Sequence, residues 1–182
     1  MPPASRRTLR CLAVVFLLTA TAASARDGMA VAVGSEPGAD FVQVAYDLGW
    51  PGTLWQRRRL ELGLRVEFGA AYWSADQYGA GRVDLGDFSV TPVLRLSHPV
   101  SSTIDLYAEG GVGVHYFTRT VLSSDVELST RFQFGDLVGF GIAFGARRQF
   151  DVAVRYLHVS NGGIRDPNGG ADLLVGRFAY RF

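Results

Sequence analysis

A strict two-residue alternation runs through the middle of this chain and limits what the chain can fold into. From Leu60 to Tyr72 every even-numbered position is apolar, and every odd-numbered position is glycine, alanine or charged. Side chains of a β-strand point alternately to two faces, so the pattern predicts a long strand with one greasy face. It returns in residues 88–97, 104–116 and 132–145, and more weakly in residues 29–33, 42–48, 151–160 and 172–182. Eight strands are therefore expected.

Strand length and the second face both favour a membrane barrel over a soluble sandwich. Several strands reach about ten residues, the length that crosses a bilayer at a tilt. The face opposite the apolar one carries the charged residues Arg65, Glu67, Arg95, Glu109, Arg155 and Arg177. Charges that face lipid are costly, so we expect these side chains inside the barrel, paired with one another. The predicted fold class is all-β, an eight-stranded antiparallel transmembrane β-barrel with a narrow, glycine-rich interior.

The two ends of the chain indicate export and insertion. Residues 1–25 combine three arginines, a short apolar run and the small-residue sequence Ala23-Ser24-Ala25, which predicts a cleaved signal peptide. The alternative is an N-terminal anchor helix, although the apolar run is short for one. The predicted domains are thus a signal peptide, residues 1–25, and an outer-membrane β-barrel, residues 26–182. The chain ends in alternating Phe178, Tyr180 and Phe182, similar to the terminal signal of outer-membrane barrels, so we expect the barrel-assembly machinery to insert it.

The connections between the predicted strands orient the barrel. Short turns are expected in the periplasm and longer loops outside, namely residues 97–103 and 146–149 against residues 74–86, 117–131 and 161–171. This arrangement puts both termini in the periplasm and makes the protein a multi-pass barrel of the cell outer membrane. The connection Gly49–Arg58 is longer than an ideal periplasmic turn, and Arg57-Arg58-Arg59 is expected to be solvated there.

Several individual side chains carry expectations of their own. Trp50, Trp55, Tyr72 and Trp73 fall near strand ends, where interfacial aromatic residues belong. His115 points to the inner face and is expected to be a satisfied interior residue. Asp136 interrupts the apolar face of its strand near the outer end. We interpret it as a β-bulge or loop position, and the alternative is that it contacts the polar residues at the outer end of the adjacent strand, residues 151–160.

Composition excludes several other classes of function. The formal net charge of +1 gives no electrostatic reason to expect a nucleic-acid partner. Cys11 is the only cysteine and lies in the predicted signal peptide, so the mature chain can form neither an internal disulfide nor a cysteine metal site. We expect no metal ion and no cofactor.

Three polar side chains interrupt the apolar faces of the last two strands. The face that holds Val152 and Val154 also holds His158 and Ser160, toward the outer end of the barrel. Asp172 opens the last strand on the apolar face of that strand. Residues 161–171 join the two strands, so strand pairing can bring the three side chains together.

These residue types suit nucleophilic catalysis. His158 can act as a base on the Ser160 hydroxyl, while Asp172 holds the imidazole and stabilises the imidazolium. Asn161 and the backbone of Gly162-Gly163 can donate hydrogen bonds to an oxyanion. The spacing alone leaves another interpretation open, in which the three are ordinary polar residues at the membrane interface.

The segment from Arg155 to Asp172 resembles the signature of the outer-membrane lipid A 3-O-deacylase family, PagL. The shared features are a His-x-Ser-Asn motif, a glycine shortly after it, Pro167-Asn168 in the loop and an acidic residue that opens the last strand. The resemblance implies that His158 is the base, Ser160 the nucleophile and Asp172 the acidic member, which is glutamate in the best-known form. It also implies that Asn161 and Gly163 form the oxyanion hole.

The resemblance further implies a function. The protein would be a serine esterase that hydrolyses the ester-linked 3-hydroxyacyl chain at position 3 of lipid A in the outer leaflet. Its implied partners are lipid A or lipopolysaccharide as substrate and the lipids of the outer membrane. Two alternatives remain: a non-catalytic small barrel that serves structure or adhesion, and an outer-membrane phospholipid esterase. A homodimer, the acyl-chain preference and latency in the membrane stay open.

Overall fold

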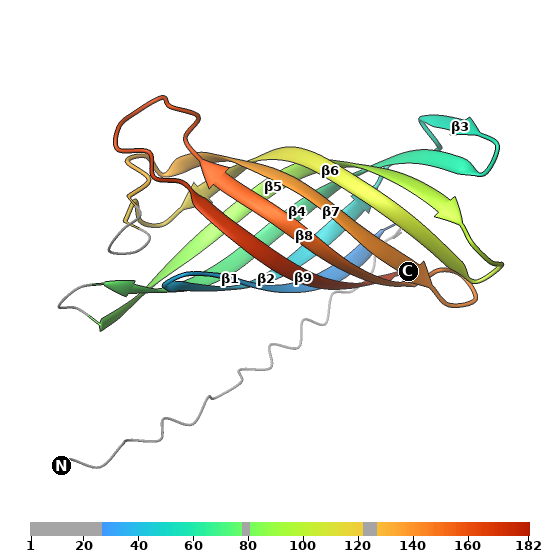
Figure 1. Ribbon diagram of the computed structural model, residues 1–182, viewed down its shortest axis with the longest axis horizontal. Helices are drawn as coiled ribbons and strands as arrows, with labels where there is room; N and C mark the ends of the chain where they lie inside the picture. The colour runs from blue at the N-terminus through green and yellow to red at the C-terminus, as the bar shows by residue number, and fades with distance from the viewer. Residues whose placement is uncertain (1–26, 78–80, 122–126) are drawn as a thin grey trace, which may run out of the picture.

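The computed structural model describes residues 27–77, 81–121 and 127–182, which form a closed antiparallel barrel (Figure 1). Its wall strands are β1 (Gly28–Glu36), β2 (Ala39–Gly49), β4 (Leu60–Gln77), β5 (Gly81–Pro99), β6 (Ile104–Phe117), β7 (Phe132–Phe144), β8 (Phe150–Ser160) and β9 (Ala171–Arg181). Consecutive wall strands pair with each other, and β1 also pairs with β9, which closes the sheet. The predicted fold class is confirmed. The signal peptide predicted for residues 1–25 lies outside the described residues.

The outward face of the barrel is apolar, as the alternation predicts. Phe132 and Phe140 are each 70% exposed, and Val112 is 60% exposed. Soluble monomers rarely expose continuous apolar surface on this scale, so the wall is a lipid-facing surface.

No helix among the described residues is long and apolar enough to cross a membrane.

The inward charges form one ion-pair network, again as expected. The buried carboxylate of Glu109 lies 3.1 Å from Arg65, 2.8 Å from Arg95 and 2.7 Å from Arg155. The network also includes Asp47, Glu67, Asp151 and Arg177. Inward glycines make room for it, because a Cβ at Gly139 would lie only 2.8 Å from the Arg155 side chain.

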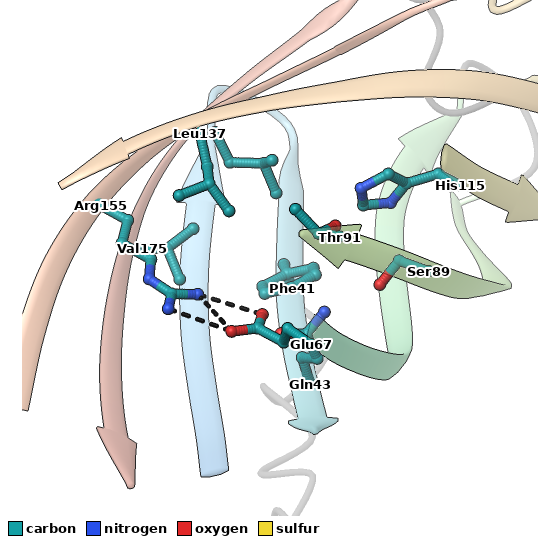
Figure 2. Close-up of a pocket in the computed structure, with 10 residues that line it drawn as sticks. Phe41, Gln43, Glu67, Ser89, Thr91, His115, Leu137, Arg155 and Val175 are labelled. Carbon is teal, nitrogen blue, oxygen red and sulfur yellow. Dashed lines mark hydrogen bonds and ion pairs between the residues drawn. The ribbon is translucent and has the colours of Figure 1, made fainter. Parts of the chain in front are cut away.

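Above this network the barrel interior holds a large apolar cluster, and a small cavity lies between the network and this cluster (Figure 2). Figure 2 shows Arg155 reaching Glu67 on one side of the cavity and the His115 ring on the other. The cavity measures about 20 Å³, which holds about one water molecule and no acyl chain. His115 Nδ1 lies 3.0 Å from the Asp87 carboxylate, so its interpretation as a satisfied interior residue is confirmed.

The outer hairpin of β4 and β5 corrects two expectations. The predicted loop of residues 74–86 is mostly strand, because β4 continues to Gln77 and β5 begins at Gly81. Trp73 is not an interfacial aromatic residue: it is fully buried inside the barrel, with its ring centroid 5.1 Å from that of Phe41. Outside the bilayer the pattern inverts, with apolar side chains inward and polar ones outward.

The connection Gly49–Arg58 also contains structure that the sequence did not predict. A short strand, β3 (Trp55–Arg57), pairs with the first residues of β4 and forms a hairpin that extends beyond the barrel wall. Figure 1 shows β3 at the end of the barrel that also holds the C-terminus, away from the loop between β8 and β9.

Candidate active site

His158 and Asp172 meet on the outward face of the barrel. They are directly opposed in the register of β8 and β9, and directly opposed side chains lie on the same face of a sheet. His158 Nδ1 lies 2.7 Å from an Asp172 carboxylate oxygen, within hydrogen-bond distance. The two side chains are 37% and 59% exposed, so the pair is open to whatever surrounds the barrel. A carboxylate on Nδ1 leaves Nε2 as the nitrogen that faces a reacting group.

Ser160 follows two residues later on β8 and shares the outward face with His158. Gly170 lies against both residues: a Cβ placed there would be 3.1 Å from His158 Cε1 and 3.6 Å from the Ser160 Cβ. The φ of Gly170 is +65°, a conformation that L-residues rarely adopt. In the part of the chain that the structure describes, no direct hydrogen bond joins Ser160 to His158. The three predicted residues are thus gathered at one end of β8 and β9, with only the His158–Asp172 contact formed.

Two further residues hold Asp172, and sequence reasoning missed both. The Tyr156 hydroxyl donates a hydrogen bond of 2.5 Å to the same carboxylate oxygen that His158 contacts. The Asp172 backbone amide donates to the Glu36 carboxylate at 3.0 Å. Tyr156 could have been found from its place two residues before His158 on the same face. Glu36 comes from β1, and no local pattern connects it to Asp172.

Asp136 does not occupy a bulge or a loop, so that interpretation was wrong. Asp136 lies on β7 within regular strand pairing, opposite Val112 of β6 on one side and opposite His158 of β8 on the other. Its side chain is exposed on the outward face. His158 is therefore flanked by aspartates on both adjacent strands, and it bonds to Asp172.

The loop after Ser160 is built around the buried side chain of Asn161. The Asn161 side-chain amide donates to the carbonyl oxygens of Leu128, at 3.1 Å, and Arg165, at 2.6 Å. Its oxygen accepts a hydrogen bond from the Gly163 backbone amide at 2.9 Å. Leu128 belongs to the connection between β6 and β7 and is itself fully buried in the barrel interior. The loop between β8 and β9 is thus tied to the neighbouring outer loop.

The two predicted oxyanion donors are both engaged inside this loop. The Gly163 backbone amide donates to Asn161 Oδ1, and the Asn161 backbone amide donates to Asn168 Oδ1 at 3.0 Å. Gly162 and Gly163 have φ values of +65° and +77°, which glycine adopts without strain. The chain therefore brings these donors next to Ser160, although each has a partner.

The site lies where the outward face changes from apolar to polar. Toward the outer end of the barrel, the outward residues of β8 run from Val154 through Tyr156 to His158, and those of β9 run from Leu174 to Asp172. Below it, the outward face of β6, β7 and β8 forms an apolar groove of about 460 Å³, lined by Leu106, Phe140, Ile142, Val152 and Val154 among others. Among the described residues, no group of three or more His, Cys, Asp or Glu side chains is placed to hold a metal ion.

Sequence comparisons with known proteins identify one family. The family model described as lipid A 3-O-deacylase (PagL) matches residues 40–181. The lipid A deacylase PagL of Bordetella bronchiseptica is 34% identical over 122 residues, which cover 66% of this chain and 64% of that protein, just under two thirds of its length. The Pseudomonas aeruginosa lipid A deacylase PagL is 31% identical over 133 residues, 71% of this chain and 73% of that protein.

The structural comparison leads to the same family. A solved structure described as the crystal structure of the outer membrane enzyme PagL superposes with a TM-score of 0.74 and 25% sequence identity. The superposition covers 85% of this chain and 99% of the solved one. The chain belongs to the lipid A 3-O-deacylase (PagL) family.

Proposed function

We propose that this protein is a lipid A 3-O-deacylase, an esterase that uses Ser160, His158 and Asp172 as a catalytic triad. The observation that carries the proposal is the 2.7 Å contact between His158 Nδ1 and Asp172 on the lipid-facing wall of a barrel of this family. A histidine held by a carboxylate, beside a serine, is the arrangement that activates a hydroxyl nucleophile. The substrate is the ester-linked 3-hydroxyacyl chain at position 3 of lipid A.

The reaction proceeds in two halves. The Ser160 oxygen attacks the ester carbonyl carbon while His158 Nε2 takes the hydroxyl proton, and Asp172 stabilises the imidazolium that forms. The tetrahedral intermediate then breaks its bond to the sugar oxygen, which takes the proton from His158 and leaves as a free hydroxyl. Water, deprotonated by His158, attacks the acyl-Ser160 ester and releases the 3-hydroxy fatty acid. Atoms balance with one water consumed for each acyl chain released.

The backbone amides of Asn161 and Gly163 are the oxyanion donors in this proposal. Each must exchange its partner within the loop for the substrate oxygen. The left-handed conformations of Gly162 and Gly163 support this exchange, because glycine can rotate without a Cβ clash. The Asn161 side chain then serves to hold the loop rather than to contact the substrate.

The depth of the site supports a lipid substrate. The ester bonds of lipid A lie between the sugar headgroup and the acyl chains, and His158 and Asp172 lie where the barrel wall changes from apolar to polar. The acyl chain then extends into the apolar groove below, whose lining includes Phe140 and Val154. All three triad residues come from one chain, so the mechanism requires no second copy.

Maturation of the protein is part of the same proposal. Residues 1–25 act as the signal peptide, and the barrel-assembly machinery inserts the mature chain from the periplasm. The alternating C-terminal residues Phe178, Tyr180 and Phe182, all outward and exposed, support recognition by that machinery.

Mass spectrometry of lipid A from cells that express the protein tests the function. We expect loss of the 3-linked hydroxyacyl group with the wild type and no loss with Ser160→Ala or His158→Ala, while both variants still insert as folded barrels. Asp172→Ala should lower the rate less sharply. Full activity in the Ser160 or His158 variant would refute the triad.

A matched control exists inside the barrel. Ser89, like Ser160, lies beside a histidine that contacts an aspartate, since Ser89 is opposite His115 and His115 contacts Asp87. That set is buried, so Ser89→Ala should leave deacylation unchanged. Product analysis separates the alternatives: acyl release from phospholipid with intact lipid A would identify a phospholipid esterase, and no Ser160-dependent product from either lipid would indicate a non-catalytic barrel.

A further inference from the structure

The hairpin between β2 and β4, residues 50–64, lies at the opposite end of the barrel from the candidate active site (Figure 1). Trp55 is directly opposite Leu62 and Arg57 is directly opposite Leu60. Opposed side chains share a face, and the even residues of β4 are on the lipid-facing side, since Phe68 and Tyr72 are exposed while Glu67 is buried. Trp55 and Arg57 therefore continue the outward face of the barrel instead of turning away from it.

The side chains of this outward face are largely exposed. Trp50 is 52% exposed, Trp55 45% and Leu60 37%. A two-stranded hairpin is marginally stable in water by itself, so its apolar face needs something to pack against. The lipid-facing wall is directly continuous with this face through Leu62 and the rest of β4, which indicates that the bilayer supplies the cover.

The order of residue types along the hairpin follows the layers of a bilayer surface. From the barrel wall toward the tip, Trp50 comes first, then Trp55 opposite Leu62, and the tip itself holds Arg57-Arg58-Arg59, with Leu60 opposite Arg57. Tryptophan prefers the interface between hydrocarbon and headgroups, and arginine extends beyond it to phosphate. In the described residues, none of these three guanidinium groups pairs with a carboxylate, whereas Arg148 of a neighbouring turn lies 2.6 Å from Asp105.

We propose that this hairpin binds the headgroups of anionic glycerophospholipids, such as phosphatidylglycerol, in the periplasmic leaflet. Trp50 and Trp55 lie at the interface, and the three arginines bind lipid phosphates. Arg57, Arg58 and Arg59 are exposed, as expected for a solvated turn, and the proposal adds bound lipid phosphates to that turn. The contact sets how deeply the periplasmic end of the barrel lies in the bilayer. It is independent of the proposed function because it involves no residue of the candidate site.

The tryptophans of the chain allow a direct test. The sequence contains three, and Trp73 is fully buried inside the barrel. Lipids with brominated acyl chains quench tryptophan by contact, so in nanodiscs they report on Trp50 and Trp55. The folded protein is placed in phosphatidylethanolamine discs that contain a minor, equal fraction of brominated phosphatidylglycerol or of brominated phosphatidylethanolamine.

We expect quenching by brominated phosphatidylglycerol to exceed quenching by brominated phosphatidylethanolamine at least about twofold, because each basic residue near an anionic surface adds measurably to the attraction. The difference should shrink in high salt and disappear in the triple variant R57Q/R58Q/R59Q. The control R147Q, an exposed arginine of the turn between β7 and β8, should keep it. Equal quenching by both lipids in the wild type, or a preference that survives the triple variant, would overturn the proposal.

Discussion

Replacing Glu109 by glutamine tests whether the interior ion pairs hold the barrel together. The Glu109 side chain is completely buried and accepts hydrogen bonds from Arg65, Arg95 and Arg155. Glutamine has nearly the same volume, so the substitution removes a charge without opening a cavity. Any loss of stability then measures the missing charge and not poorer packing.

The structure also bounds the size of the effect. Removal of one partner from a buried ion pair costs about 3–5 kcal/mol. Each of the three arginines keeps a second carboxylate, namely Asp47 for Arg65, Asp151 for Arg95 and Glu67 for Arg155. We therefore expect the lower end of the range, about 3 kcal/mol, or roughly a 100-fold change in the unfolding equilibrium constant.

Urea titration of the protein in lipid vesicles, followed by tryptophan fluorescence and by heat-modifiable migration on gels, measures this change. The control is Asp40→Asn, which breaks the exposed pair of Asp40 and Arg82 and should cost less than about 1 kcal/mol. Deacylation by folded Glu109→Gln should persist, because the candidate site is on the outer wall. If Glu109→Gln unfolds at the wild-type urea concentration, or no earlier than Asp40→Asn, the network does not stabilise the barrel as argued.

Three other substitutions test the surroundings of the candidate site. Tyr156→Phe removes the hydrogen bond to Asp172 and should lower the deacylation rate roughly threefold to tenfold, with little change in KM and no additional loss in an Asp172→Ala background, measured by lipid A mass spectrometry. Gly170→Ala places a Cβ 3.1 Å from His158 Cε1 and should reduce the rate at least about tenfold while the barrel melts nearly as before; an unchanged rate would show that His158 has room to move. Asn161→Ala removes the hydrogen bonds to the Leu128 and Arg165 carbonyl oxygens and should open residues 162–170 to hydrogen exchange, and unaltered protection there would contradict the structural role of Asn161.

The strands inside the bilayer were predictable because the two faces of the barrel wall have different surroundings, lipid outside and a narrow polar interior inside. Lipid requires apolar side chains outward, and the narrow interior requires small or paired polar ones, so parity alone assigned Glu109 and Arg155 to the inside. The identity of the ion pairs was not predictable. Arg155 and Glu67 are 88 residues apart in the chain, and their contact depends on the barrel closing.

The loop contacts of the candidate site were beyond local patterns for the same reason. Parity placed His158 and Asp172 on one face, and the register of β8 and β9 put them opposite each other. The Asn161 side chain donates a hydrogen bond to the carbonyl oxygen of Leu128, 33 residues earlier, and no local pattern predicts that contact. A contact between two outer loops leaves no periodic signal in either segment.

The errors at the outer end of β4 and the position of the site have one physical cause. Above the bilayer, water surrounds the barrel, so outward positions such as Ser74 become polar while the inward Trp73 and Leu85 fill the interior. A prediction from the apolar alternation alone ignores this inversion, so it ends β4 too early and places Trp73 on the outside of the barrel. On β8 and β9 the same change from apolar to polar falls at His158 and Asp172. Polar residues on a greasy face are therefore most informative at the height where the surrounding solvent changes, because an ester between a headgroup and its acyl chain lies at that height too.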